Sequence, residues 1–260
     1  MPSIKLNTGH SMPVIGLGTW QARGDPVVQA VKDALEIGFR HIDTALLYQN
    51  EKEVGEGVRA EIAKGTVKRE DVFITTKVWP EKGITKQKSL DTVQHSLKQM
   101  NLSYIDLVLV HWPHEDWKAI YAGLEEAFDQ KLVRSIGVSN FSPQNIEELM
   151  KTAKVKPAVN QINIHPTLNQ DETVEYCKKH DIAVTGYSPL GVGHILDNPT
   201  LMEIGKKHKK SSAQVAIRWQ IQRGLIVIPK STHKAYIKED FEVFDFVLTD
   251  EEMKRIHDLK

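Results

Sequence analysis

Short strand-like runs alternate with amphipathic helix-like segments along almost the whole of this 260-residue chain. Parallel strands joined by helices form an α/β sheet, and a chain of about 250 residues is typical of a closed eight-stranded barrel. We therefore expect a (β/α)8 TIM barrel that occupies residues 1–260 as one domain. The expected strands are 16–20, 39–44, 72–78, 105–111, 135–140, 158–162, 183–188 and 225–228.

Local signals place the helices between these strands. The first helix is expected to have Asp25 as its N-cap and Pro26 as its first residue, and to stop at Gly38. A turn cluster at residues 7–10 predicts a β-hairpin of 4–6 and 12–14 ahead of the barrel. Two extra helices are expected at 199–208 and 250–259. The other helices are expected at 51–63, 86–99, 117–130, 143–153, 171–179, 213–223 and 235–241.

Charge and composition exclude several classes of partner. The formal net charge is zero and the pI is about 7.2, so the chain has no electrostatic footprint for nucleic acid or an anionic membrane. The run Lys206–Lys210 is expected to form the solvated end of a helix. The single cysteine, Cys177, has no partner for an internal disulfide, and no apolar run is long enough to span a bilayer. We expect a cytoplasmic protein without a membrane segment.

Three neighbouring strands end in titratable side chains. Asp43 ends the second strand, Lys77 the third and His111 the fourth, and Tyr48 follows Asp43 in the same strand-to-helix loop. Taken alone, each has an ordinary structural explanation, such as a solvated lysine or a hydrogen-bonded core histidine. A carboxylate on a buried strand face requires a cation, however, and the carboxyl ends of barrel strands are where such enzymes keep their chemistry.

Long motifs around these residues resemble those of the aldo-keto reductase superfamily. The resemblance covers nearly the whole chain and is closest to short-loop reductases of small carbonyls, such as 2,5-diketo-gluconate reductase and prostaglandin F synthase. It implies a TIM barrel that reduces aldehydes or ketones to alcohols. The matching segments are 16–20, 38–45 with Tyr48 and 50–51, 77–79, 106–113, 137–141, 160–161, 187–190 and 228–231.

The four titratable residues suit carbonyl reduction, which takes a hydride from a nicotinamide and a proton from an acid. Tyr48 is the candidate acid. A free phenol titrates near pH ~10, so the ammonium of Lys77 is expected to favour its ionisation, and Asp43 to hold Lys77 charged and in place. His111 is expected to direct a ring N–H at the carbonyl oxygen. The resemblance assigns the same four positions to catalysis.

The resemblance also implies a nicotinamide cofactor. Tyr187 matches the residue that stacks on the nicotinamide, and Ser139, Asn140 and Gln161 match those that bind its carboxamide. Taken alone, Asn140 could be a turn residue and Tyr187 a core aromatic. The other implied cofactor residues are Thr19, Trp20, Asp43, Ser188, Leu190, Lys230, Ser231, Thr232, Tyr236, Glu239 and Asp240.

The chain departs from the family pattern in the last of these segments. Tyr236 stands where an arginine is usual, and it is followed by Glu239–Asp240 instead of Glu-Asn. A charge-assisted hydrogen bond contributes ~1.5–3 kcal/mol, so its loss is expected to weaken the preference for a 2′-phosphate tenfold or more. We expect NADPH to be preferred, with NADH also accepted. Tyr236 could stack on the adenine instead.

The substrate pocket is expected to be open and to accept small carbonyls broadly, since the loop after Pro113 is short and the chain stops at Lys260. A monomer is expected. The expected substrate-binding residues are Trp20, Leu47, Tyr48, Trp79, His111 and Trp112.

Other fold, metal and function classes have less support in the sequence. A Rossmann fingerprint would need glycine at position 21, where the chain has Gln21. A metal site is not expected, because Pro113 separates His111 from His114 and no other ligand stands at suitable spacing. The alternative functions are a nicotinamide-binding sensor or regulatory subunit with little turnover, and a purely structural barrel.

Overall fold

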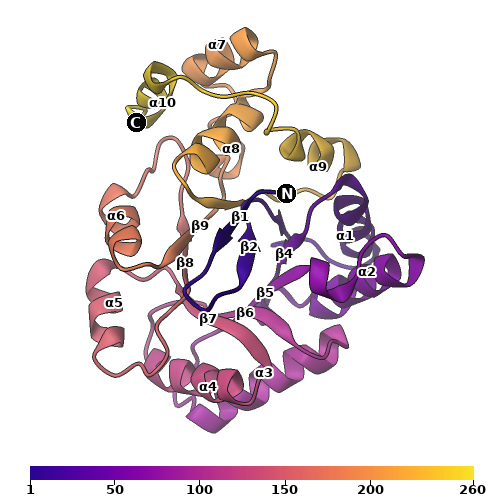
Figure 1. The fold of residues 1–260 in the computed structure, drawn as a ribbon, viewed down its shortest axis with the longest axis vertical. Coiled ribbons are helices and arrows are strands. Elements are labelled where there is room, and N and C mark those ends of the chain that lie inside the picture. The colour runs from indigo at the N-terminus through magenta and orange to yellow at the C-terminus, as the bar shows by residue number, and fades with distance from the viewer.

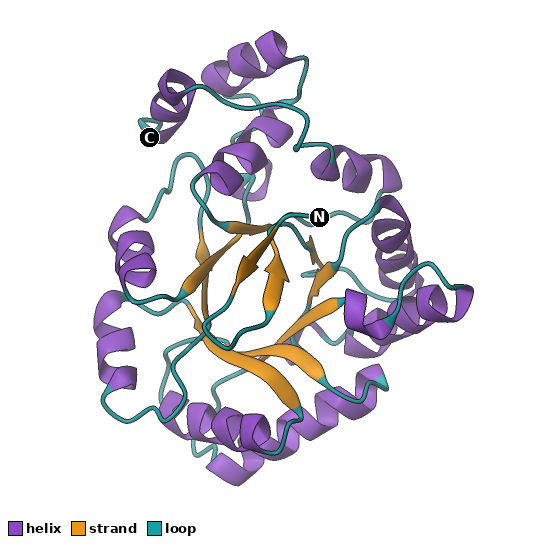
Figure 2. Cartoon of the chain, in the orientation of Figure 1, coloured by secondary structure: helices purple, strands orange, loops and turns teal.

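The computed structural model describes residues 1–260 and contains the expected barrel (Figures 1 and 2). Eight parallel strands lie side by side in chain order, from β3 to β10. Isolated parallel bridges from Ile15 to Val227 and from Gly18 to Lys230 join the first of these strands to the last. The strands are β3 (Leu17–Gly18), β4 (His41–Asp43), β5 (Phe73–Val78), β6 (Ile105–Val110), β7 (Val133–Ser139), β8 (Val159–Asn163), β9 (Ala183–Tyr187) and β10 (Ile226–Ile228).

Helices surround the strands, as Figure 2 shows. The two expected extra helices are confirmed: α7 (Pro199–His208) stands between β9 and α8, and α10 (Asp250–His257) ends the chain beside α7 (Figure 1). The ring consists of α1 (Asp25–Ile37), α2 (Glu51–Lys64), α3 (Lys86–Met100), α4 (Trp117–Asp129), α5 (Pro143–Met150), α6 (Asp171–Lys179), α8 (Ser212–Gln222) and α9 (Lys234–Phe241).

The expected hairpin closes one end of the barrel. It consists of β1 (Ser3–Lys5) and β2 (Ser11–Pro13), each starting one residue earlier than expected. The Asn7 side-chain amide donates hydrogen bonds to the carbonyl oxygens of Pro157 and Asp181, which precede β8 and β9. The hairpin therefore lies over the amino ends of the strands (Figure 1), and the carboxyl ends remain open.

The main core lies between the sheet and the ring of helices. It contains 55 buried apolar side chains, and a smaller cluster of eight fills the barrel beneath the hairpin. This layering explains why the alternating sequence pattern predicted the elements: each helix buries one apolar face on the outside of the sheet. No helix of the structure is both long enough and apolar enough to cross a membrane.

Several predicted element ends were wrong by a few residues. The N-cap of α1 is Gly24, not Asp25, because the cap backbone has φ 64° and ψ −154°, a conformation open only to glycine. The predicted helix 143–153 ends at Met150, and the amides of Thr152 and Ala153 turn back to the carbonyl of Leu149. The strands predicted at 16–20 and 39–44 are shorter at both ends, and only their carboxyl ends pass into the loops that shape the open face.

Candidate active site

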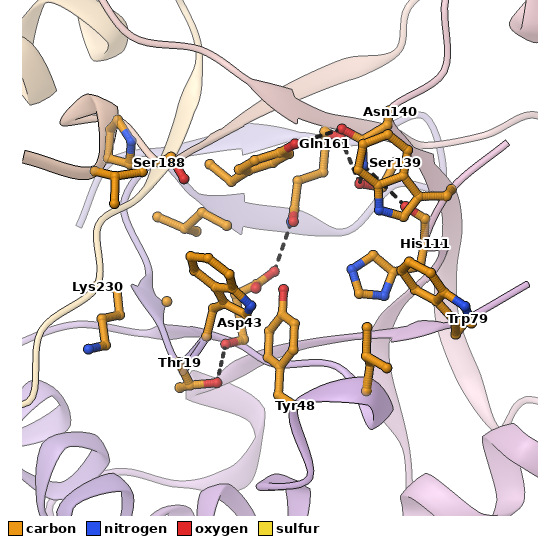
Figure 3. A pocket seen from close by; sticks show the side chains of 18 residues that line it. Thr19, Asp43, Tyr48, Trp79, His111, Ser139, Asn140, Gln161, Ser188 and Lys230 are labelled. Carbon is orange, nitrogen blue, oxygen red and sulfur yellow. Dashed lines mark hydrogen bonds between the residues drawn. The ribbon is translucent and has the colours of Figure 1, made fainter. Parts of the chain in front are cut away.

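A cavity of about 410 Å³ opens at the carboxyl ends of the barrel strands. Figure 3 shows Tyr48 between Asp43 and His111, with Ser188 and Lys230 at one end and Trp79 at the other. All six predicted substrate residues line it. The lining residues are Gly18, Thr19, Trp20, Asp43, Leu47, Tyr48, Trp79, His111, Trp112, Ser139, Asn140, Gln161, Tyr187, Ser188, Pro189, Val192, Ile228 and Lys230.

A buried ion pair lies under the Tyr48 hydroxyl. Lys77 Nζ is 2.7 Å from Asp43 Oδ1, and it also donates to the carbonyl of Thr44 at 2.8 Å. Its distance to Tyr48 Oη is 3.4 Å. The second Asp43 oxygen accepts a 2.8 Å hydrogen bond from Gln161 Nε2. Both members of the ion pair are at most 2% exposed, so the pair is held in one geometry and water is excluded from it.

Burial and charge compete at this pair. Burial by itself lowers the pKa of Lys77, but the Asp43 carboxylate and the Tyr48 phenol outweigh it, so the pKa of Lys77 is raised and the ammonium stays charged. Burial also raises the pKa of Tyr48, and the nearby ammonium offsets this only in part. Lys77 thus acts on Tyr48 in the expected direction, but the phenol remains protonated at neutral pH.

His111 faces the same hydroxyl from the end of β6. Its ring packs edge-on against Tyr48, with 5.9 Å between centroids, and against Trp79 at 5.0 Å. Burial, followed by the positive charge of Lys77, lowers the pKa of His111 to about 3. The imidazole is therefore neutral at physiological pH.

This neutrality leads to a prediction about pH. Because the pKa of His111 is far below its ordinary value, the ring should stay uncharged between about pH 5 and 8. Ionisation of this ring should therefore not change the rate of carbonyl reduction in that range. Titration of the ring signals by NMR, assigned with a His111→Asn variant, checks it. A step near the ordinary histidine pKa at His111 would contradict the prediction.

A chain of hydrogen bonds continues from this cluster along the cavity wall. The Tyr187 hydroxyl donates to Asn140 Oδ1 at 2.9 Å, and Asn140 Nδ2 donates to the carbonyl of His111 at 3.2 Å and to Ser139 Oγ at 3.0 Å. Ser139 in turn donates to the carbonyl of Gln161 at 2.8 Å. The structure therefore brings together the residues assigned to the nicotinamide end of the cofactor.

Buried Asn50 joins the two loops at the other side. Its amide donates to the carbonyls of Thr19 and Ala22, both at 2.9 Å, and its oxygen accepts a 2.6 Å hydrogen bond from Thr44. Thr19 also donates to the carbonyl of Asp43 at 2.9 Å. The loop that carries Tyr48 is thereby fixed to the loop that carries Trp20.

A second cavity of about 680 Å³, here called the distal cavity, continues beyond Lys230, which lines both. Six predicted cofactor residues, Lys230 among them, line the distal cavity, whereas Thr232 lines neither cavity. The distal cavity is lined by Leu190, Leu196, Met202, Lys206, Lys210, Ser211, Ser212, Ala213, Lys230, Ser231, Tyr236, Glu239 and Asp240.

The sequence had indicated Lys230 but not the other two lysines of the distal cavity. Lys206 and Lys210 were expected in a solvated run, but both line this cavity, and Lys210 is held 2.7 Å from Asp245. Two loop residues of the first cavity, Val192 and Pro189, were also missed. Val192 lies between two glycines and has φ 56°, so a Gly-x-Gly turn after a barrel strand was the available signal.

The donor groups present fit a nicotinamide dinucleotide. One end offers an aromatic ring with amides and hydroxyls, and the other offers lysines, serines and the exposed ring of Tyr236. Such a division suits a nicotinamide at one end and an adenosine phosphate at the other. The two cavities share Lys230 in their walls, so the groups suited to the two ends of such a molecule lie on either side of this residue.

The fold and the site together define an oxidoreductase of the barrel class, which reduces aldehydes or ketones with a nicotinamide cofactor. A model of the aldo/keto reductase family matches residues 14–260. The chain belongs to the aldo/keto reductase family.

Individual relatives agree with this assignment. The chain is 47% identical to the 9,11-endoperoxide prostaglandin H2 reductase of Trypanosoma cruzi, over 98% of this chain and 90% of the relative. It is 42% identical to the glyoxal reductase of Bacillus subtilis, over 98% and 91%. The crystal structure of a Bombyx mori aldo-keto reductase in complex with NADP matches with a TM-score of 0.93 and 40% identity, over 98% and 92%. Nothing in these relatives favours the alternative of a sensor with little turnover.

Proposed function

We propose that this enzyme reduces a broad range of small aldehydes and ketones, with Tyr48 as the proton donor and with NADPH preferred to NADH. The observation that carries the proposal is the buried Lys77–Asp43 pair beneath the Tyr48 hydroxyl, in the floor of an open cavity. The side chains that line this cavity come from strands and loops between β3 and β10, and their convergence supports the proposal.

Each residue of the cluster has a separate task. The reduced nicotinamide, when bound, supplies the hydride. Tyr48 gives its proton to the carbonyl oxygen, and the ammonium 3.4 Å away stabilises the phenolate that remains. Asp43 keeps Lys77 charged and in place. Neutral His111 orients the carbonyl by donating a hydrogen bond to its oxygen.

The mouth of the cavity supports broad specificity. Trp20 is 48% exposed, Leu47 49% and Val192 72%, so the rim is apolar and offers few polar groups for discrimination. The relatives are named for glyoxal and for a prostaglandin endoperoxide, which differ widely in size. Small carbonyls are therefore expected to bind with modest affinity.

The direct test is the loss of NADPH absorbance on addition of a small aromatic aldehyde or of methylglyoxal. Turnover of both is expected. Cofactor binding without turnover of any small carbonyl would refute the proposed activity, and tight discrimination between large isomeric substrates, such as steroids, would refute the broad specificity.

The cofactor preference rests on the distal cavity. The arginine usual in the family is absent, and Tyr236, which is 60% exposed, stands in its place at the cavity wall. Lys230 supports binding of a 2′-phosphate as a point charge. The silkworm relative was crystallised with NADP. Equal dissociation constants for NADPH and NADH would refute the preference.

Restoring the arginine should sharpen the preference. Tyr236→Arg is expected to lower the Kd for NADPH about tenfold and to leave that for NADH within about twofold, since a charge-assisted hydrogen bond contributes ~1.5–3 kcal/mol. Fluorescence titration with each dinucleotide measures both constants. Ala235→Arg is the matched control, because it adds the same charge to an exposed position of α9 that does not line the cavity. Equal gains in the two variants would point to a general charge effect.

A further inference from the structure

A buried carboxyl group in the distal cavity has no hydrogen-bond partner. Asp240, near the end of α9, is 6% exposed and lines the cavity, yet no side chain or backbone group donates to it. Buried carboxylates are nearly always paired or hydrogen-bonded, because desolvation of the charged form is costly. No protein group offsets the cost of burying its charge, and this favours the uncharged form of the carboxyl group.

The charged groups around Asp240 do not neutralise it. On its own helix, Glu239 adds a second negative charge and Tyr236 is neutral. Lys206 from α7 and Lys230 after β10 reach the cavity wall. The ammonium of Lys210 is paired with other groups: it lies 2.7 Å from the Asp245 carboxylate and donates a hydrogen bond to the carbonyl of Glu242.

Charged groups of the neighbouring helices α8 and α1 are engaged by other partners. On α8, Arg218 donates to Gln222 and to the carbonyl of Val243, and neutral Gln214 donates to backbone carbonyls of α9. On α1, Asp33 and Glu36 are both engaged by Lys234. Burial, followed by repulsion from Glu239, raises the pKa of Asp240 to about 7. The group is thus close to half ionised at neutral pH.

We propose that the Asp240 carboxyl group sets how strongly the enzyme prefers a phosphorylated dinucleotide, by repelling the adenosine 2′-phosphate when it is ionised and admitting it when it is protonated. The inference rests on the proposed function, in which the distal cavity receives the adenosine phosphate. A 2′-phosphate carries a charge of about −1.5 to −2, whereas the ribose hydroxyl of NADH carries none. NADPH binding therefore takes up a proton at Asp240, and NADH binding does not.

The sign of the pH dependence follows from this. A phosphate beside Asp240 raises the pKa of the carboxyl group further above about 7. Below that value the carboxyl group is already protonated in the free enzyme, so NADPH binds without penalty. As the pH rises above it, a proton must be taken up on binding, and affinity for NADPH falls. The preference for NADPH over NADH is therefore largest in mild acid and narrows in mild alkali.

The test measures binding and not turnover. Between about pH 6.5 and 8.5 the Kd of the parent for NADPH should rise about tenfold, while that for NADH changes less than about twofold. Asp240→Asn removes the charge at nearly constant shape. At about pH 8.5 it should lower the Kd for NADPH about tenfold, and it should remove most of the pH dependence.

The matched control is Glu242→Gln, which removes one negative charge from the exposed end of the same helix, outside the cavity. It should leave both dissociation constants unchanged. An Asp240→Asn variant that tightens neither dinucleotide, that tightens both equally, or that keeps the pH dependence of the parent would overturn the inference.

Calorimetry of the parent tests the inference without any variant. The heat of NADPH binding should differ between two buffers of different ionisation enthalpy, in the direction that indicates net proton uptake. The heat of NADH binding should be the same in both buffers. No difference between the dinucleotides would overturn the inference. Carbonyl turnover with NADPH but no effect at Asp240 refutes the inference alone. The expected binding pattern without turnover refutes the proposed function alone.

Discussion

Tyr48→Phe is expected to lower kcat for carbonyl reduction by about 10²- to 10⁴-fold, the usual range for loss of a positioned general acid. The phenol is the only hydroxyl group of the cavity 3.4 Å from the buried Lys77 ammonium, and burial keeps it protonated until the reaction begins. Phenylalanine preserves the ring packing against His111 and removes only the proton donor. Steady-state rates with a small aromatic aldehyde measure the effect, and fluorescence titration should show that NADPH still binds.

Tyr187→Phe is the matched control. Tyr187 is a second phenol of the same cavity, but its hydroxyl donates to Asn140 and not to a substrate. Its loss removes one neutral hydrogen bond, so kcat should fall less than about tenfold. Equal losses in the two variants would show that Tyr48 is not specifically the acid.

Lys77→Met should affect both stability and turnover. Methionine approximates the length of the lysine chain but leaves the Asp43 carboxylate buried without its cation, which typically costs about 3–5 kcal/mol in free energy of unfolding. It also removes the charge that stabilises the Tyr48 phenolate, so kcat should fall at least about 10²-fold. Urea unfolding and steady-state kinetics measure the two effects separately.

A double variant separates the two roles of Lys77. Adding Asp43→Asn to Lys77→Met removes the unpaired charge, so the free energy of unfolding should recover in part. Turnover should not recover, because the phenolate still lacks its ammonium. If kcat recovered together with stability, Lys77 would be a structural residue and the proposed mechanism would be wrong.

The residues of the first cavity could be found from sequence because of how parallel strands are arranged. Asp43, Lys77 and His111 lie at or next to the carboxyl ends of β4, β5 and β6, and the carboxyl ends of neighbouring parallel strands meet at one face of the barrel. The hydrophobic periodicity of the sequence predicted the strands, and the positions of the strand ends predicted which titratable side chains lie together. What the sequence did not supply was the balance of effects: the pKa of Tyr48 is raised because burial outweighs Lys77, and burial is a property of the whole fold.

The distal cavity was harder to predict, because its wall is assembled from helices and loops far apart in the chain. Lys206 begins a run of basic residues that is expected to be solvated from the local sequence, and only the packing of α7 against α8 brings it to the cavity that Tyr236 also lines. Asp240 is one turn beyond Tyr236; the resemblance implied that it binds the cofactor, and the sequence marked it as a departure from the family pattern. The burial of Asp240 raises the pKa of its carboxyl group, and this burial depends on contacts between distant segments that a local sequence pattern does not predict.

The seam at which the barrel closes has a consequence for how the molecule is made. Strand β3, near the start of the chain, is paired on one side by β4 but meets its other neighbour only through the bridges of Ile15 and Gly18 to residues 227 and 230. During synthesis the side of β3 that faces β10 cannot pair until nearly the entire polypeptide has been made. Pairings between segments so distant in sequence form slowly. Asp43, Tyr48 and Lys77 leave the ribosome early, but the walls that shield them from water are complete only when the last strand arrives.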